Sequence, residues 1–194
     1  MSEHGAELII RFQTLRPMSW RNGGGTTREI MACGTEGGEG FDWRLSLAAI
    51  EGSGRFSEFP GMKRIFTVVE GDLVVLAVDG YTRQVHHGVP FPFSGDSSVQ
   101  ASLPGGSVQA LNVITRPAAV SASVVVDRLV PDRPHLVRPD QCVVVLSGRA
   151  TLTAHGAEHG MGVYDTARFG GPGDAAITGE GLVAVVSLRP GSVA

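Results

Sequence analysis

Arginine, serine and asparagine side chains recur in a few short segments, and this combination is typical of a site that binds a carboxylate. Arginine supplies a permanently charged, forked donor, while serine and asparagine supply neutral hydrogen bonds. Lys63 is the only lysine, so nearly all of the positive charge is arginine. We predict a ligand site with charge from Arg44, Arg64 and Arg116 and neutral hydrogen bonds from Asn22, Ser46, Ser57 and Asn112.

The spacing of these residues suggests strands that could present them. Alternation along residues 42–50 places Arg44 and Ser46 on one face of a strand, and the opposite face is apolar. Such a polar face points either to solvent or into a wet barrel interior, and its place inside a longer motif favours the interior. Asn112 and Arg116 also share a strand face, roughly 13 Å apart at 3.3 Å per residue, and could frame the two ends of a ligand.

A run of three glycines follows Trp20 and Asn22 and precedes Arg28. Without side chains, this backbone can approach another group closely, and its N–H groups could form a concavity for an anion. A close crossing of two strands explains the same run equally well. We include Trp20, Asn22 and Arg28 in the candidate ligand site, with Trp20 and Phe56 as walls of a pocket or as ordinary core.

The elements that must position these residues are strands. Hardly any segment has the 3.6-residue period of a helix, and short alternating or β-branched runs end at Gly, Pro, Asp or Ser. The chain is therefore predicted to be all-β, a sandwich or barrel. The predicted strands lie near residues 8–12, 27–33, 42–51, 64–70, 73–79, 83–86, 108–115, 119–129, 142–147, 150–155 and 182–189.

An internal repeat divides the chain into two modules. Residues 68–80 (VVEGDLVVLAVDG) resemble residues 144–156 (VVLSGRATLTAHG), and a later Gly95-Asp96 answers Gly173-Asp174. Each copy reads as strand, Gly turn, alternating strand, Gly turn and Gly-Asp turn. We expect an N-terminal unit at residues 1–118 and a smaller C-terminal unit at residues 119–194.

The repeated module resembles the cupin barrel, a double-stranded β-helix. Metal-binding cupins carry two His, one Glu and a further His, and these positions correspond here to Ser57, Phe59, Arg64 and Gln109. In the second copy the Glu position is Gln141. Neither set can hold a transition metal, so we predict no metal and no cofactor in either barrel.

An arginine in the interior of the first barrel has a physical consequence. Arg64 stays protonated and is costly to leave unpaired. It needs either an internal acid or an anionic ligand. The candidate internal acids are Glu29, Asp42 and Glu58.

Four ordered blocks carry a more specific resemblance: WRNGGGTTRE at residues 20–29, DWRLS at 42–46, FSEFPGMKR at 56–64 and LNVITR at 111–116. Together they resemble the HutD/Ves family. The resemblance implies a bicupin fold and, for HutD, a link to bacterial histidine catabolism through binding of a carboxylated intermediate such as N-formylglutamate. The Ves branch is associated with stress response, and the sequence does not assign the branch.

Composition limits the other function classes. A net charge of −3 and a pI near 6.0 offer no basic face for nucleic acid. Cys33 and Cys142 sit in apolar runs, so both are expected to be buried thiols in a reducing compartment. With no visible signal peptide or 18-residue apolar stretch, we expect a cytoplasmic protein without a membrane partner.

The leading hypothesis is a non-metal bicupin that binds a small anionic metabolite in a regulatory or accessory role, rather than an enzyme. Two alternatives stay open. A metal-free isomerase- or lyase-like enzyme would need a general base, for which the candidates are Glu29, Glu58 and His135. A structural interaction protein would have a filled interior, and a homodimer is compatible with the sequence.

Overall fold

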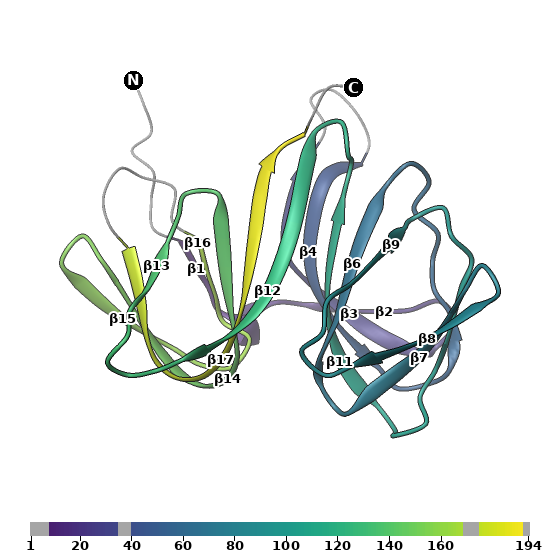
Figure 1. The fold of residues 1–194 in the computed structure, drawn as a ribbon, viewed down its shortest axis with the longest axis horizontal. Helices are drawn as coiled ribbons and strands as arrows, with labels where there is room; N and C mark the ends of the chain where they lie inside the picture. The colour runs from purple at the N-terminus through teal and green to yellow at the C-terminus, as the bar shows by residue number, and fades with distance from the viewer. Residues whose placement is uncertain (1–7, 35–39, 169–174, 192–194) are drawn as a thin grey trace. The chain divides into compact units, whose positions relative to one another are not determined.

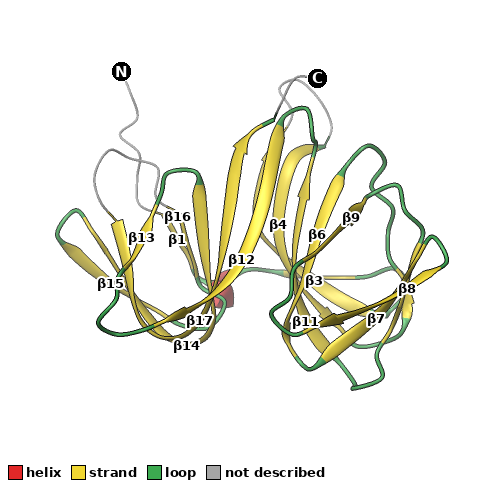
Figure 2. Ribbon diagram, viewed as in Figure 1, coloured by secondary structure: helices red, strands yellow, loops and turns green. Residues whose placement is uncertain are grey.

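Strands form almost all of the regular structure of this chain. The computed structural model describes residues 8–34, 40–168 and 175–191. Within these residues the only helix is one short 3-10 turn, η1 (Phe12–Thr14), as the single red segment in Figure 2 shows. The all-β prediction is confirmed.

The chain forms two units, and their bounds differ from a single cut after residue 118. The N-terminal unit contains residues 15–121 together with Pro190 and Gly191. The C-terminal unit contains residues 122–189 together with the described N-terminal residues Leu8–Thr14. The difference arises because the first strand of the chain pairs with a strand near residue 167, which no local sequence pattern reveals.

The N-terminal unit consists of two antiparallel sheets, one of six strands and one of four (Figure 1). Between them lies a core that includes Phe66, Val74 and Leu76. The six-stranded sheet has the order β2 (Pro17–Ser19), β3 (Gly25–Gly34), β4 (Phe41–Ile50), β11 (Val108–Thr115), β6 (Lys63–Glu70) and β9 (Phe91–Ser94). The four-stranded sheet has the order β5 (Gly54–Arg55), β10 (Val99–Ser102), β7 (Leu73–Val78) and β8 (Tyr81–His86).

The C-terminal unit is built on one sheet that surrounds its own core, with Val143, Leu152 and Ile177 fully buried. The order of its main path is β1 (Leu8–Ile10), β16 (Thr166–Arg168), β14 (Gln141–Ala154), β17 (Ala175–Pro190) and β12 (Val120–Leu129). Two further strands pair with it: β13 (His135–Val137) with β17, and β15 (Ala157–Met161) with β14.

The structure adds seven short strands that the sequence patterns do not predict, namely β2, β5, β9, β10, β13, β15 and β16. Each has two to five residues, too few for an alternation to be distinct from a loop. The strands predicted at 142–147 and 150–155 are one continuous strand, β14. A register shift between Val145 and Ser147 lets it pass the glycine at position 148 without ending.

The two copies of the sequence repeat share their hairpin turns. Asp79 and Gly80 connect β7 to β8 with φ of 48° and 85°, and His155 and Gly156 connect β14 to β15 with φ of 50° and 77°. Two successive residues with positive φ make the turn that matches the twist of a two-residue hairpin. Gly71 and Gly148, aligned in the repeat, also both have positive φ. The third matched pair cannot be compared, because Gly173 and Asp174 lie outside the described residues.

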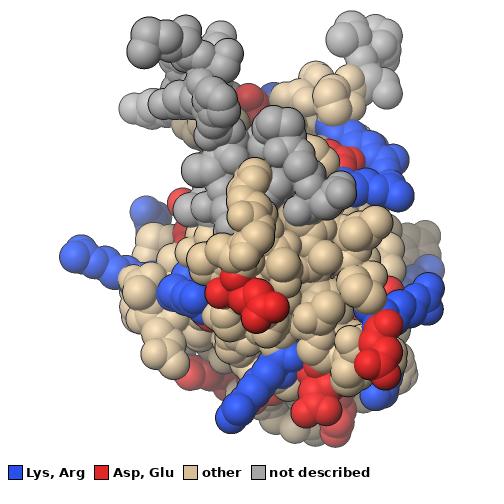
Figure 3. Space-filling view, turned by 90° about the vertical axis from the view of Figure 1, so that its left-hand side faces the viewer, with Lys and Arg blue, Asp and Glu red and all other residues tan. Residues whose placement is uncertain are grey.

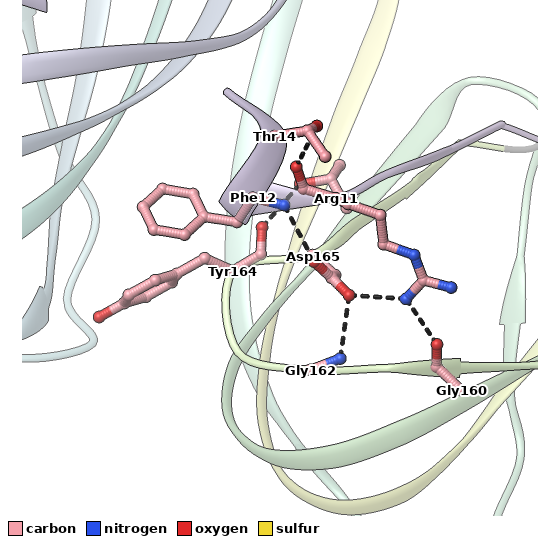
Figure 4. Close-up of polar contacts among 8 residues, drawn as sticks. Arg11, Phe12, Thr14, Gly160, Gly162, Tyr164 and Asp165 are labelled. Atoms are coloured by element: carbon pink, nitrogen blue, oxygen red, sulfur yellow. Dashed lines mark hydrogen bonds and ion pairs between the residues drawn. The ribbon is translucent and has the colours of Figure 1, made fainter. Parts of the chain in front are cut away.

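One carboxylate anchors the N-terminal segment to the C-terminal unit (Figure 4). Asp165 accepts hydrogen bonds from the backbone N–H of Phe12 at 3.0 Å and of Gly162 at 3.1 Å, and it forms a 2.7 Å ion pair with Arg11. The same Arg11 side chain donates to the carbonyl of Gly160. Burial alone would raise the pKa of Asp165, but these hydrogen bonds and the Arg11 charge outweigh it and hold the pKa below its ordinary value.

The three-glycine run forms the tight connection from β2 to β3. The amides of Gly23 and Gly24 already donate within this turn, to the carbonyl of Trp20 and to Asn22 Oδ1. At Gly25, where β3 begins, a Cβ atom would lie 2.1 Å from the carbonyl oxygen of Ala49. Of the two explanations for the run, this geometry favours a close approach of two strands.

The surface carries charges of both signs. On the face shown in Figure 3, the described basic and acidic side chains are interspersed. Cys142 is buried, and burial raises the pKa of its thiol to about 11. Cys33 is exposed, contrary to expectation, because it lies on β3 beyond the segment that pairs with β2. No helix among the described residues has the length and apolar character to cross a bilayer.

We predict that Gly25→Ala lowers the free energy of unfolding by at least about 2 kcal/mol, because the added methyl group collides with backbone that cannot move aside cheaply. The adjacent Gly24→Ala is the matched control, since its Cβ would have ordinary contacts, 3.4 Å from Asn22 Oδ1. Chemical denaturation of both variants is the measurement. Equal stability of the two variants would contradict the close approach.

We predict that Asp165→Ala lowers the free energy of unfolding by about 2 kcal/mol at neutral pH, because Arg11 and two partly buried N–H groups lose their acceptor. Since the folded-state pKa of Asp165 lies below its ordinary value, its contribution is complete above about pH 4 and is lost as the pH falls through the folded-state pKa. Denaturation at pH 7 and at about pH 3 should therefore show a smaller difference between variant and parent at the lower pH. If the difference in unfolding free energy between variant and parent did not change with pH, the stabilising role of the Asp165 carboxylate would be refuted.

Candidate functional site

A cavity of about 560 Å³ lies in the N-terminal unit. Its lining comes from the inner face of the six-stranded sheet, the β2–β3 connection and the segment after β5. The lining residues are Met18, Ser19, Trp20, Arg21, Asn22, Thr27, Arg44, Ser46, Ala48, Ile50, Arg55, Phe56, Ser57, Phe59, Arg64, Phe66, Asn112 and Ile114. Four of them are arginines, and none of the described lining residues is Asp, Glu or His.

Pairing of the three central strands places the inner arginines in one row. Ile114 on β11 is opposite Arg44 on β4 and opposite Arg64 on β6. The next row inward joins Ser46, Asn112 and Phe66. Because neighbouring strands are about 4.8 Å apart, the two arginine backbones lie about 10 Å apart with one isoleucine between them.

Arg64 is the most buried charged group of the site. Its side chain is 7% exposed, and its Nη atoms donate to the carbonyl of Ser57 and to Asn112 Oδ1, each at 3.1 Å. Three aromatic rings surround the guanidinium, with centroids 4.9 to 5.4 Å from Cζ: Phe56, Phe59 and Phe93. Ring faces stabilise a cation but do not neutralise it.

No carboxylate neutralises Arg64 within the described part of the chain. Asp42, one of the acids considered above, pairs with Arg116 at 3.3 Å instead, while Glu58 is exposed. Burial, and then the nearby charge of Arg44, lowers the pKa of Arg64 to about 10. The side chain therefore still carries its charge at neutral pH, and its buried Nε has no described hydrogen-bond partner.

Arg44 is the second inner cation. Its Cζ lies 4.8 Å from the ring centroid of Phe41 and 5.2 Å from that of Phe59. Burial lowers its pKa, and the charge of Glu29 partly offsets this effect. Like Arg64, it has a buried Nε without a hydrogen bond to any described residue. Two neighbouring guanidinium groups with unused donors can together hold one carboxylate or another small anion.

The structure brings together eight of the ten residues proposed from the sequence: Trp20, Asn22, Arg44, Ser46, Phe56, Ser57, Arg64 and Asn112. The other two lie outside the lining. Arg28 follows Thr27, which faces the cavity, so its side chain lies on the opposite face of β3 and donates to the carbonyl of Leu15 at 2.6 Å. Arg116 lies one residue beyond β11, where the strand has ended and the side chain turns to Asp42.

Two further arginines, Arg21 and Arg55, line the cavity and were not among the residues proposed from the sequence. Both are exposed, so they add positive charge at its open side. The sequence feature that could have indicated them is adjacency to the candidate site: Arg21 follows Trp20, and Arg55 precedes Phe56. A strand pattern does not resolve such residues, because they lie in a turn and at a strand end.

The metal-ligand positions of cupins also fall on this cavity. Ser57, Phe59 and Arg64 all line it, whereas Gln109 does not, and Asn112 on the same strand faces the interior instead. A serine, a phenylalanine and an arginine do not fit a transition metal. Across the described residues, no three His, Cys, Asp or Glu side chains gather closely enough to hold a metal ion.

Comparison with known families is consistent with this arrangement. A sequence model of the HutD family matches residues 12–185, nearly the whole chain. The chain belongs to the HutD family. An uncharacterised 21.2 kDa protein in the hutC 3′ region of Pseudomonas putida is 46% identical over 110 residues, and protein Ves of Citrobacter koseri is 45% identical over 112 residues. Each alignment spans 56% of this chain and only 58% of the relative.

Solved structures agree with the family and the fold. HutD from Pseudomonas fluorescens SBW25, in its formate condition, is 31% identical and superposes with a TM-score of 0.82, covering 96% of this chain and all of the other. A cupin 2 conserved barrel domain protein from Leptotrichia buccalis is only 9% identical but has a TM-score of 0.59 over 94% of this chain and 96% of its own. The predicted cupin-like bicupin fold is thus confirmed.

We predict that Arg64→Met leaves the free energy of unfolding, measured in buffer without added carboxylates, within about 1 kcal/mol of the parent value. Removing one member of a buried ion pair costs about 3–5 kcal/mol, whereas removing a buried cation that has no acid partner relieves a desolvation penalty. Chemical denaturation is the measurement. A loss of 3 kcal/mol or more would reveal an internal acid that neutralises Arg64.

Proposed function

We propose that this HutD-family protein binds a small carboxylate in the cavity of its N-terminal unit and acts as a binding or regulatory protein. The observation that carries this proposal is the buried Arg64, charged at neutral pH and without a described carboxylate partner, next to the half-buried Arg44. A guanidinium has five N–H donors, and described residues accept from one on each Nη of Arg64, so each Nη keeps one donor for a ligand.

The lining suits an anion with an apolar part. Asn112 and Ser46 are buried polar groups in the row next to the arginines, while Phe56, Phe59 and Ile114 supply an apolar wall. The cavity volume of about 560 Å³ is in the range of small-metabolite sites. Arg21 and Arg55 at the open side extend the positive potential outward, which favours entry of anions.

N-formylglutamate is the first ligand to test. The family resemblance implies a carboxylated intermediate of histidine catabolism, and one relative lies in the hutC 3′ region of its genome. Its carboxylates match the arginine-rich lining, and its amide-like formyl group could use the neutral hydrogen-bonding groups Ser46 and Asn112.

The enzyme alternative gains no support from the position of its candidate bases. Glu29 and Glu58 are exposed and do not line the cavity, and His135 belongs to the C-terminal unit. A general base must lie within hydrogen-bonding reach of the proton it removes. We therefore propose binding without turnover.

We predict that N-formylglutamate raises the melting temperature of the purified protein saturably, equivalent to about 2.7 kcal/mol at one hundred times its dissociation constant. Urocanate, glutamate and formate, each with and without divalent metals, complete the series. Arg64→Met and Arg44→Met should abolish the shift, because each removes an inner donor. Arg116→Met is the matched control and should keep it, since Arg116 pairs with Asp42 outside the cavity.

A shift with divalent metal alone, or none with any acid, would contradict carboxylate binding. Loss of the shift in Arg116→Met but not in Arg64→Met would move the ligand to another surface.

A further inference from the structure

Building on the carboxylate site proposed above, we propose that Asp96, an exposed residue outside the cavity, is a positioning residue for its two inner arginines. It acts through the loop Ser57–Gly61, which it fastens to the β9–β10 turn. Neither Asp96 nor this turn lines the cavity, so the residue has no direct contact with a ligand there.

The loop supplies the contacts that orient both guanidinium groups. The carbonyl of Ser57 accepts a 3.1 Å hydrogen bond from Arg64. The Phe59 ring faces both cations, with its centroid 5.3 Å from Cζ of Arg64 and 5.2 Å from Cζ of Arg44. A small displacement of this loop therefore changes the orientation of both donors that we propose for the anion.

The loop itself has no strand pairing to hold it in place. Its backbone is bound instead to Gly95: the Phe59 N–H donates to the carbonyl of Gly95 at 2.8 Å, and the Gly95 N–H donates to the carbonyl of Met62 at 2.7 Å. The two segments touch directly, since a Cβ on Gly95 would lie 2.3 Å from the carbonyl oxygen of Phe59. Whatever fixes the β9–β10 turn thus fixes the loop.

Asp96 joins the far end of the loop to the turn. Its Oδ1 accepts from the backbone N–H of Gly61 at 3.0 Å, and its Oδ2 accepts from the Ser94 hydroxyl at 3.0 Å. The Gly61 amide, and then the Ser94 hydroxyl, lowers the pKa of Asp96, so the carboxylate is charged at neutral pH. Gly95 and Asp96 together thus attach the loop to the turn at Phe59 and Gly61, and Gly95 also binds the next residue, Met62.

This attachment explains two sequence motifs at once. The segments FSEFPG at residues 56–61 and FSGD at 93–96 are far apart in the chain, yet only the first contributes residues to the cavity lining. Productive binding needs donors held within about half an ångström of their place, so residues behind the site influence affinity without touching the ligand.

Isothermal titration of N-formylglutamate into three variants tests the proposal. Asp96→Ala should weaken binding about tenfold, the change expected for loss of a hydrogen bond to a charged group. Asp96→Asn should bind within about twofold of the parent, because its amide can still accept from Gly61 and donate to Ser94. Asp127→Ala is the control: it also loses a hydrogen bond from a backbone amide to a carboxylate, that of Arg128 at 2.8 Å, but it belongs to the C-terminal unit. Unchanged affinity in Asp96→Ala, or an equal loss in Asp127→Ala, would overturn the proposal.

A second measurement needs no ligand. Because the Phe59 ring lies 5.2 Å from Cζ of Arg44 and 5.3 Å from Cζ of Arg64, we expect its ring current to shift the NMR signals of both Nε–H groups, and displacing the loop should move both signals. We expect both signals to move in Asp96→Ala and to stay in place in Asp127→Ala and Asp96→Asn. If the parent protein bound no acid while these signals moved as expected, the carboxylate function would fail but the positioning role would stand. Signals that did not move in Asp96→Ala would refute the positioning role, whatever the titrations gave.

Discussion

A guanidinium group held inside a barrel, without a carboxylate partner in the described part of the chain, is the constraint on which the N-terminal unit depends. Desolvating an ion costs several kcal/mol, and Arg44 adds a second positive charge nearby. Aromatic faces, the Ser57 carbonyl and the Asn112 amide reduce this cost, but they are neutral groups. In the binding that we propose, an anion would complete the electrostatics of this interior, and ligand affinity and the cost of burying Arg64 would be two aspects of one interaction.

The sheet that carries these groups changes character along its strands. At one end, Ala48, Ala110 and Val68 are fully apolar neighbours within the core, and Leu76 lies in the same cluster. Four residues further along the same strands, the row holds Arg44 and Arg64. The inner face of this sheet thus carries both the apolar core and the polar site. Residues two apart along a strand point to the same face, so both sets of side chains face the interior. The hydrogen-bonded ladder that supports the core therefore also holds the strand residues of the site.

Local sequence patterns predicted the parts of this arrangement that depend on strand periodicity. Alternation in β4 put Arg44 and Ser46 on one face, and their place in a longer motif favoured the interior, where the structure has them. Periodicity could not show that β11 ends before Arg116 or that Arg28 lies on the outer face of β3, because both depend on where a strand begins and ends. Arg21 and Arg55 lie where no strand pattern applies. The membership of Leu8–Thr14 in the C-terminal unit depends on pairing with β16, a contact between distant residues.

That pairing of β1 with β16 also bears on how the chain is made. Ile10 pairs with Thr166, so the first described strand to leave the ribosome must wait for one of the last before it finds its partner. The N-terminal unit can complete its two sheets in the meantime, since all of their strands come from residues 17–115. Synthesis therefore leaves an unpaired leading strand until the end, and a fragment that begins at residue 119 would lack the edge of its own sheet. The sequence repeat assigns one continuous segment to each cupin-like unit. The folded C-terminal unit nevertheless needs β1, from the N-terminal part of the chain, to complete its sheet.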